Sequence, residues 1–144
     1  MSVNQVYALC GTTNSGKTST LSCLIDLLRS KAESVILDEH VGGTDYRAVF
    51  TINGLKIGVS TQGDHVSQVK KHLDAIESKC DIIFCATRTK GATCNHVIER
   101  YQDKLIWIQN MVIFNNKKYA HDNKSFIESR NTGIAKMLFQ TIPV

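Results

Sequence analysis

Four residues near the start of the chain stand at a spacing that suits phosphate binding. The segment GTTNSGKT carries the pattern G-x-x-x-x-G-K-[ST] through Gly11, Gly16, Lys17 and Thr18. Glycines at these places let the backbone turn so that successive N–H groups point at phosphate oxygens. Lys17 would bring a positive charge to the β and γ phosphates of a nucleoside triphosphate, and the Thr18 hydroxyl would complete a Mg²⁺ shell.

The segments around this motif predict that it lies between a strand and a helix. QVYALC alternates in polarity and indicates a strand over residues 5–10, and apolar residues recur at helical spacing from near Lys17 onward. A strand, a loop and a helix in this order are the context that a phosphate-binding loop requires. The residues expected to contact the nucleotide here are Gly11, Thr12, Thr13, Asn14, Ser15, Gly16, Lys17, Thr18 and Ser19.

Through this motif the chain resembles the P-loop NTPase superfamily. The resemblance covers the alternation of strands and helices along residues 1–144, which we interpret as a single domain. It implies a three-layer α/β fold with a mainly parallel sheet, and it implies binding of Mg²⁺ with ATP or GTP. Such a loop also needs partner side chains at the same edge of the sheet, and three segments compete for that position.

The first of these segments is VILDEH, in which two acids follow an apolar run. It resembles a strand that ends in a Walker B acid, or the second strand of small-molecule kinases. The resemblance implies that Asp38 meets Mg²⁺ or the hydroxyl of an acceptor. Two solvated acids in a turn would give the same pattern, and that alternative stays open.

The second segment is STQGD, which follows a hairpin predicted at Asn53-Gly54. It resembles small Ras-like GTPases, which carry a switch threonine before the hairpin and D-x-x-G after it. Thr44 and Gly63 match that pattern, but Ser60 replaces the acid. We expect Gly63 to offer its N–H to the γ-phosphate and Asp64 to orient water or bind the metal. A turn that caps the next helix is the alternative.

The third segment is ATRTKGAT, where a GTPase would carry N-K-x-D to recognise guanine. Because this chain has no acid there, we expect ATP to be favoured over GTP. Arg88 and Lys90 stand where the arginines of kinase lids reach phosphates, and cations there would stabilise the transferring group. An exposed basic loop is the alternative interpretation of these two residues.

The other elements follow from hydrophobic periodicity. We predict a strand over residues 34–40, a helix from residue 66 to 76, strands over 80–87 and 104–109, and a short helix over 95–101. Ser125 and Glu128 form a capping-box pattern that predicts the start of a last helix. The apolar residues expected to face inward from that helix are Ile127, Ile134, Met137 and Leu138. Together these elements predict a mainly parallel sheet with helices on both faces and one β-hairpin.

The strand that lies beside residues 6–10 decides which acid serves the loop. If residues 55–61 run beside it, Asp64 comes within reach of the γ-phosphate. If residues 35–37 do so instead, Asp38 takes the metal.

Composition restricts the setting in which this chain acts. The formal net charge of +4 comes from dispersed lysines and arginines, so no basic cluster supports nucleic-acid binding. No apolar run reaches the roughly 18 residues that a membrane span needs, and we expect a cytoplasmic protein. The five cysteines include no C-x-x-C pair and the five histidines no metal spacing with them, which favours free thiols in a reducing compartment.

The function expected from the sequence is Mg²⁺-dependent binding and hydrolysis of a nucleoside triphosphate, used as a switch or in the service of a protein partner. Lys17, Asp64 and Arg88 are the expected catalytic residues. The expected metal ligands come from Thr18, Asp38 and Asp64. A small-molecule or nucleotide kinase is the first alternative, and a nucleotide-binding module without catalysis is the second. The sequence does not indicate an oligomeric state.

Overall fold

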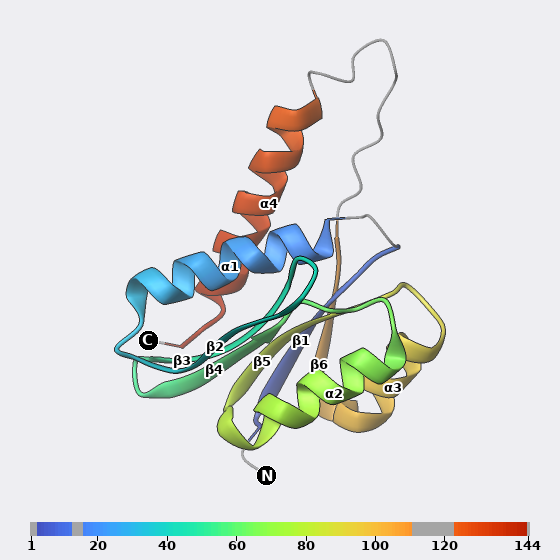
Figure 1. The fold of residues 1–144 in the computed structure, drawn as a ribbon, viewed down its shortest axis with the longest axis horizontal. Coiled ribbons are helices and arrows are strands. Elements are labelled where there is room, and N and C mark those ends of the chain that lie inside the picture. Colours follow the sequence, from blue (N-terminus) through green and yellow to red (C-terminus); the bar gives the residue numbers. More distant parts are fainter. Residues whose placement is uncertain (1–2, 13–15, 111–122, 144) are drawn as a thin grey trace.

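The computed structural model describes residues 3–12, 16–110 and 123–143. In this part of the chain a six-stranded sheet carries helices on both faces, which makes the protein an α/β protein (Figure 1). None of the helices described is both long and apolar enough to cross a bilayer. In chain order the elements are β1 (Gln5–Cys10), α1 (Lys17–Lys31), β2 (Ser34–Gly42), β3 (Asp45–Ile52), β4 (Leu55–Ser60), α2 (Val66–Ile76), η1 (Glu77–Lys79), β5 (Ile82–Thr87), α3 (Ala92–Tyr101), η2 (Gln102–Lys104), β6 (Leu105–Gln109) and α4 (Asn123–Gln140).

The sheet is mixed, with the strand order β2-β3-β4-β5-β1-β6. The pairs β4–β5, β5–β1 and β1–β6 are parallel, whereas β2–β3 and β3–β4 are antiparallel. All six residues of β5 are buried, as expected of a strand that is covered on both faces. β5 and β6 are thus the neighbours of β1, and both neighbours considered from the sequence, residues 55–61 and 35–37, are wrong.

Two hairpins link β2, β3 and β4, where the sequence analysis predicted one. The predicted hairpin at Asn53-Gly54 is confirmed, and both of its turn residues have positive φ values, 51° and 79°. In the second hairpin Gly42 pairs with Asp45, so that residues 43 and 44 form the turn. Gly42 and Gly43 also have positive φ, and this Gly-Gly pair is the hairpin signal that the sequence analysis missed. Thr44 is consequently an exposed turn residue.

Each face of the sheet has its own apolar core. On one face Leu21 and Leu24 of α1 pack with Leu138 of α4 against the sheet. On the other face Leu73 of α2 and Val97 of α3 do the same. Full burial of side chains of this size contributes about 1.5–3 kcal/mol each, which fixes α1 against its face of the sheet.

Two helices differ in detail from the sequence prediction. α3 begins at Ala92, three residues before the predicted start. α4 begins at Asn123, so Ser125 lies within the helix and is not its N-cap. Leu138 is buried as predicted, but Met137 is 47% exposed. Ala135 and the polar residues Arg130 and Asn131 are buried on this helix as well. Burial of these polar residues broke the apolar pattern from which the inward face was predicted.

Candidate functional site

The site is built at the edge of the sheet where the parallel strands end. Because β4, β5, β1 and β6 run in one direction, their carboxyl ends lie at the same edge (Figure 1). The Gly11 N–H donates to the Thr87 carbonyl at 3.1 Å, and the Asn110 N–H donates to the Cys10 carbonyl at 2.9 Å. These bonds bring the residues after β1, β5 and β6 together.

We call residues 11–18 the glycine loop. Gly16 has a φ of 87°, a left-handed conformation that glycine adopts without strain, and α1 begins directly after it. Among the described residues, no side chain caps the N-terminus of α1. An uncapped helix start leaves backbone N–H groups that can receive an anion. Thr12 and Ser19 are exposed. The predicted contacts of Thr13, Asn14 and Ser15 lie outside the described residues.

Lys17 is buried and bridges the glycine loop and an acid. Its residue is only 4% exposed, and its Nζ atom donates to the Gly11 carbonyl at 2.8 Å and to Asp64 Oδ1 at 2.9 Å. The Asp64 side chain is 33% exposed, so one side of the ion pair still faces solvent. A buried ammonium group is costly unless it is paired, and these two oxygens compensate its lost hydration.

The Asp64 side chain reaches Lys17 by crossing the end of β5. A Cβ atom at Gly63 would lie 2.7 Å from both the carbonyl carbon and the Cβ atom of Ala86, so only glycine allows this close approach. The Asp64 N–H also donates to Gln62 Oε1 at 2.7 Å, which holds the turn. Close packing against Ala86 thus explains why residue 63 is a glycine. It also explains how Asp64 reaches Lys17 although β4 does not lie next to β1.

Asp45, which the sequence analysis did not single out, is the acid beside Thr18. Its Oδ1 atom accepts hydrogen bonds from the Thr18 hydroxyl at 3.3 Å and from the Thr61 hydroxyl at 2.9 Å. Its Oδ2 atom accepts one from Gln62 Nε2 at 2.9 Å. Asp45 is the first residue of β3, directly after the Gly-Gly hairpin, so placing that hairpin from the sequence would have revealed it. In the Ras-like pattern the acid would stand at position 60, where this chain has a serine. Asp45 supplies a carboxylate beside Thr18 instead.

Asp38 is not brought to the glycine loop through any described contact. Its two carboxylate oxygens accept hydrogen bonds from Nε and Nη2 of Arg29, at 2.8 and 2.9 Å. Arg29 lies near the end of α1, and it also pairs with Asp26. Asp38 therefore fastens β2 to the far end of α1, away from Thr18 at the helix start.

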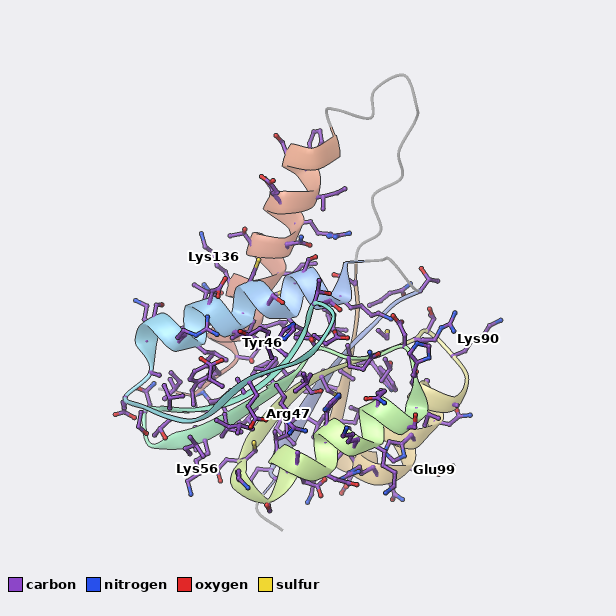
Figure 2. The ribbon with its side chains drawn as sticks, viewed as in Figure 1. Tyr46, Arg47, Lys56, Lys90, Glu99 and Lys136 are labelled. Atoms are coloured by element: carbon purple, nitrogen blue, oxygen red, sulfur yellow. The ribbon has the colours of Figure 1, made fainter. Side chains whose placement is uncertain are left out.

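Arg88 and Lys90 line a cavity beside the glycine loop. The cavity measures about 410 Å³, and Thr12, Asp64 and the start of α3 also line it. The Arg88 N–H donates to the buried Thr93 hydroxyl at 2.9 Å, which holds the basic loop against α3. Figure 2 shows Lys90 projecting outward from this loop. The structure thus brings both predicted basic residues to the same cavity as Asp64.

Thr18 and Asp45 have the donor set that Mg²⁺ prefers. A hydroxyl oxygen and a carboxylate are hard ligands, and a magnesium ion usually takes the rest of its shell from water and substrate phosphates. The Asp45 carboxylate offers about four lone-pair sites, and three donors occupy it. Among the described residues, no group of three or more His, Cys, Asp or Glu side chains could hold a metal ion. A magnesium ion held by Thr18 and Asp45 would therefore need further ligands from water or from a bound molecule.

Comparisons with protein-family models, with curated proteins and with solved structures find no match to this chain. The interpretation of the site accordingly rests on its own residues and their geometry.

Proposed function

We propose that this chain has the three-layer P-loop fold and binds and hydrolyses a nucleoside triphosphate with Mg²⁺. The observation that carries the proposal is the buried Lys17 ammonium, which lies on the glycine loop at 2.9 Å from an acid. A lysine of this kind, next to an uncapped helix start, is suited to polyphosphate. The Thr18–Asp45 pair adds a place for Mg²⁺.

The proposed chemistry assigns one task to each side chain. Lys17 leaves the Gly11 carbonyl and binds the β and γ phosphates. Asp64, released from Lys17, orients the attacking water, and Arg88 supplies positive charge to the transferring group from across the cavity. Thr18 and Asp45 would hold Mg²⁺, which when bound neutralises charge on the phosphates.

ATP is proposed as the preferred nucleotide. The segment at the end of β5, from Thr87 to Lys90, carries no carboxylate to pair with the guanine edge. Competition between ATP and GTP for the same fluorescent analogue tests this point. A large preference for GTP would show that another residue recognises guanine, and it would contradict the argument from this segment.

The first test of the function is the variant Lys17→Ala. Loss of a charged donor to phosphate should weaken binding of a fluorescent ATP analogue with Mg²⁺ by about 10- to 100-fold or more. Lys70→Ala is a matched control, because Lys70 is an exposed lysine that pairs with Asp74 on α2. Equal affinity of Lys17→Ala and the unchanged protein would refute the phosphate-loop interpretation.

A kinase activity is the second candidate, and the cavity of about 410 Å³ favours it. The cavity lies next to Asp64 and has room for a small acceptor, whose acidic groups Arg88 and Lys90 would attract. Asp38, which the sequence placed near the acceptor, pairs with Arg29 instead. Single-turnover cleavage of ATP in water alone would favour the hydrolase, and cleavage only with an added acceptor would favour the kinase. Binding without any cleavage would leave the non-catalytic module.

A further inference from the structure

A second cavity lies between α2 and the β2–β3 hairpin. It measures about 520 Å³ and shares no lining residue with the cavity beside the glycine loop. Three of the residues that line it carry basic side chains within contact of one another or next to one another in the sequence. These are Arg47 of β3 and Lys71 and His72 of α2, and Glu39, His40 and Val41 of β2 complete the lining.

The alternation of side chains along the strands brings Arg47 and Glu39 to the face of the sheet that α2 covers. Val49, two residues after Arg47, lies in the apolar core on this face, and Leu37, two residues before Glu39, packs against that core. Arg47 and Glu39 are direct partners across the hairpin, and Arg47 Nε donates to Glu39 Oε2 at 2.8 Å. This ion pair holds one edge of the guanidinium group at the cavity.

His72 meets another edge of the same guanidinium group. It is only 3% exposed, and Arg47 Nη1 donates to His72 Nδ1 at 3.2 Å. Because a guanidinium group has no acceptor, Nδ1 must accept, and the neutral ring carries its proton on Nε2. Burial first, and then the charges of Arg47 and Lys71, lower the pKa of His72, although Asp45 acts in the opposite direction. At neutral pH His72 is therefore a donor at Nε2.

Donors from three side chains at this cavity have no acceptor in the described part of the chain. They are the Nη2 group of Arg47, the Nε2 group of His72 and the ammonium group of Lys71, which is exposed and has no ion pair there. Glu39 is the one acid among the described residues that line the cavity, and Arg47 already engages it. The cavity thus has an excess of donors and of positive charge, which suits an oxyanion.

We propose that this cavity binds a phosphate group through Arg47, Lys71 and His72. A carboxylate has two oxygens, which a single guanidinium group can satisfy, whereas a phosphate has enough oxygens for donors from three side chains. The cavity is larger than the one of about 410 Å³ beside the glycine loop, so it has room for a small organic body attached to the phosphate. The proposal does not depend on the nucleotide proposed for the glycine loop.

The test follows the His72 ring resonances, assigned with His72→Gln, while inorganic phosphate or glycerol 3-phosphate is added. Both probes should shift these resonances in a saturable way. Lys71→Gln should weaken the binding by about 3- to 10-fold, because an exposed ammonium group is partly screened by solvent. Lys70→Gln is the matched control and should keep its affinity, since Lys70 is the neighbouring exposed lysine, pairs with Asp74 and does not line the cavity.

The source of the phosphate group follows from comparing the two probes. Tighter binding of glycerol 3-phosphate would support a phosphorylated small molecule as the occupant, and equal binding would support free phosphate. Acetate that binds as tightly as phosphate would overturn the assignment to phosphate. The absence of a saturable His72 shift with either probe would overturn the proposal, and so would equal affinity of Lys71→Gln and the unchanged protein.

The same titration in Lys17→Ala separates this cavity from the glycine loop. A folded Lys17→Ala should retain the His72 shift, because Lys17 does not line this cavity. Loss of the shift in that variant would show that phosphate acts from the glycine loop, and it would overturn the proposal while leaving the proposed function in place. A retained shift together with unchanged ATP affinity of Lys17→Ala would support this cavity and refute the proposed function.

Discussion

Replacing Asp64 with asparagine should raise the affinity for ATP while slowing its cleavage. In the structure Lys17 is held by Asp64 and by the Gly11 carbonyl. Under the proposed function it must exchange these partners for phosphate oxygens when the ligand enters. The asparagine side chain would keep a hydrogen-bond acceptor of nearly the same shape without the charge. Asp64→Asn thus removes a competitor for Lys17 and a source of repulsion toward the triphosphate.

The size of the effect follows from the geometry of the pair. At 2.9 Å and an effective dielectric constant of about 20, the Coulomb attraction is about 6 kcal/mol. Most of it is offset by the lost hydration of the buried ammonium, so hydrogen bonds to charged groups have a net value of about 1.5–3 kcal/mol. The asparagine retains part of that value, and the Asp64 side chain is one-third exposed. We therefore expect a gain of about 1–2 kcal/mol, or about 5- to 30-fold in affinity.

The assay measures ATP binding in EDTA and single-turnover cleavage with Mg²⁺. EDTA removes the metal, so a change in affinity reports on the loss of the Asp64 charge and not on metal binding. Cleavage should fall strongly, because the orienting carboxylate acts in the transition state. Asp38→Asn is the control and should change neither quantity, since Asp38 pairs with Arg29. Unchanged or weaker binding by Asp64→Asn in EDTA would refute the argument that the ion pair competes with the ligand.

Three further variants test other parts of the structure. Gly16→Ala should lower the unfolding temperature, because a side chain at a φ of 87° costs about 1–2 kcal/mol and the added methyl group overlaps Arg130. The double variant with Arg130→Ala should regain only the part of the unfolding temperature that was lost through this overlap. Asp45→Asn should raise the Mg²⁺ concentration for half-maximal cleavage without weakening ATP binding in EDTA, and an unchanged Mg²⁺ requirement would exclude Asp45 as a ligand. Burial, and then the Arg47 charge, lower the pKa of His72 below its usual 6.5, so His72 protonates first in the unfolded chain. The contribution of neutral His72 to stability is complete above pH 6.5 and is lost as the pH falls below that value, by at most about 1.4 kcal/mol per pH unit. In urea unfolding at pH 7.5 and 5.5, the free energy of unfolding should therefore differ less between the two pH values in His72→Gln than in the unchanged protein.

The sequence predicted the features that depend on neighbouring residues. Gly16, Lys17 and the start of α1 follow from one short motif and the helical spacing after it. Asn53-Gly54 predicted a turn because both positions require positive φ, and that requirement is local. The six strands and most of the helices were also predicted near their observed places, because apolar periodicity is a local signal.

The order of the strands and the contacts of Asp45 and Arg130 were not predictable in this way. A hydrophobic pattern shows that β5 is buried but not which strands flank it, and its place between β4 and β1 rests on pairing between distant residues. Asp45 and Arg130 carry no motif of their own. Asp45 reaches Thr18 through a hairpin, and Arg130 reaches Gly16 through the packing of α4 on α1. The Gly-Gly pair before Asp45 was a local signal for its hairpin, whereas the contact between Arg130 and Gly16 leaves no mark on the local sequence.

The pairing of β1 has a consequence for the order in which the chain can fold during its synthesis. β1 is made first, yet Val6 finds its strand partners only at Ile83 and Leu105. β2, β3 and β4 can pair with one another as soon as they emerge, because short turns join them. The segment that carries Lys17 is thus anchored late, and we expect ribosome-bound chains that stop before β6 to retain no ATP. Retention by such chains would show that β6 is not needed to form the site.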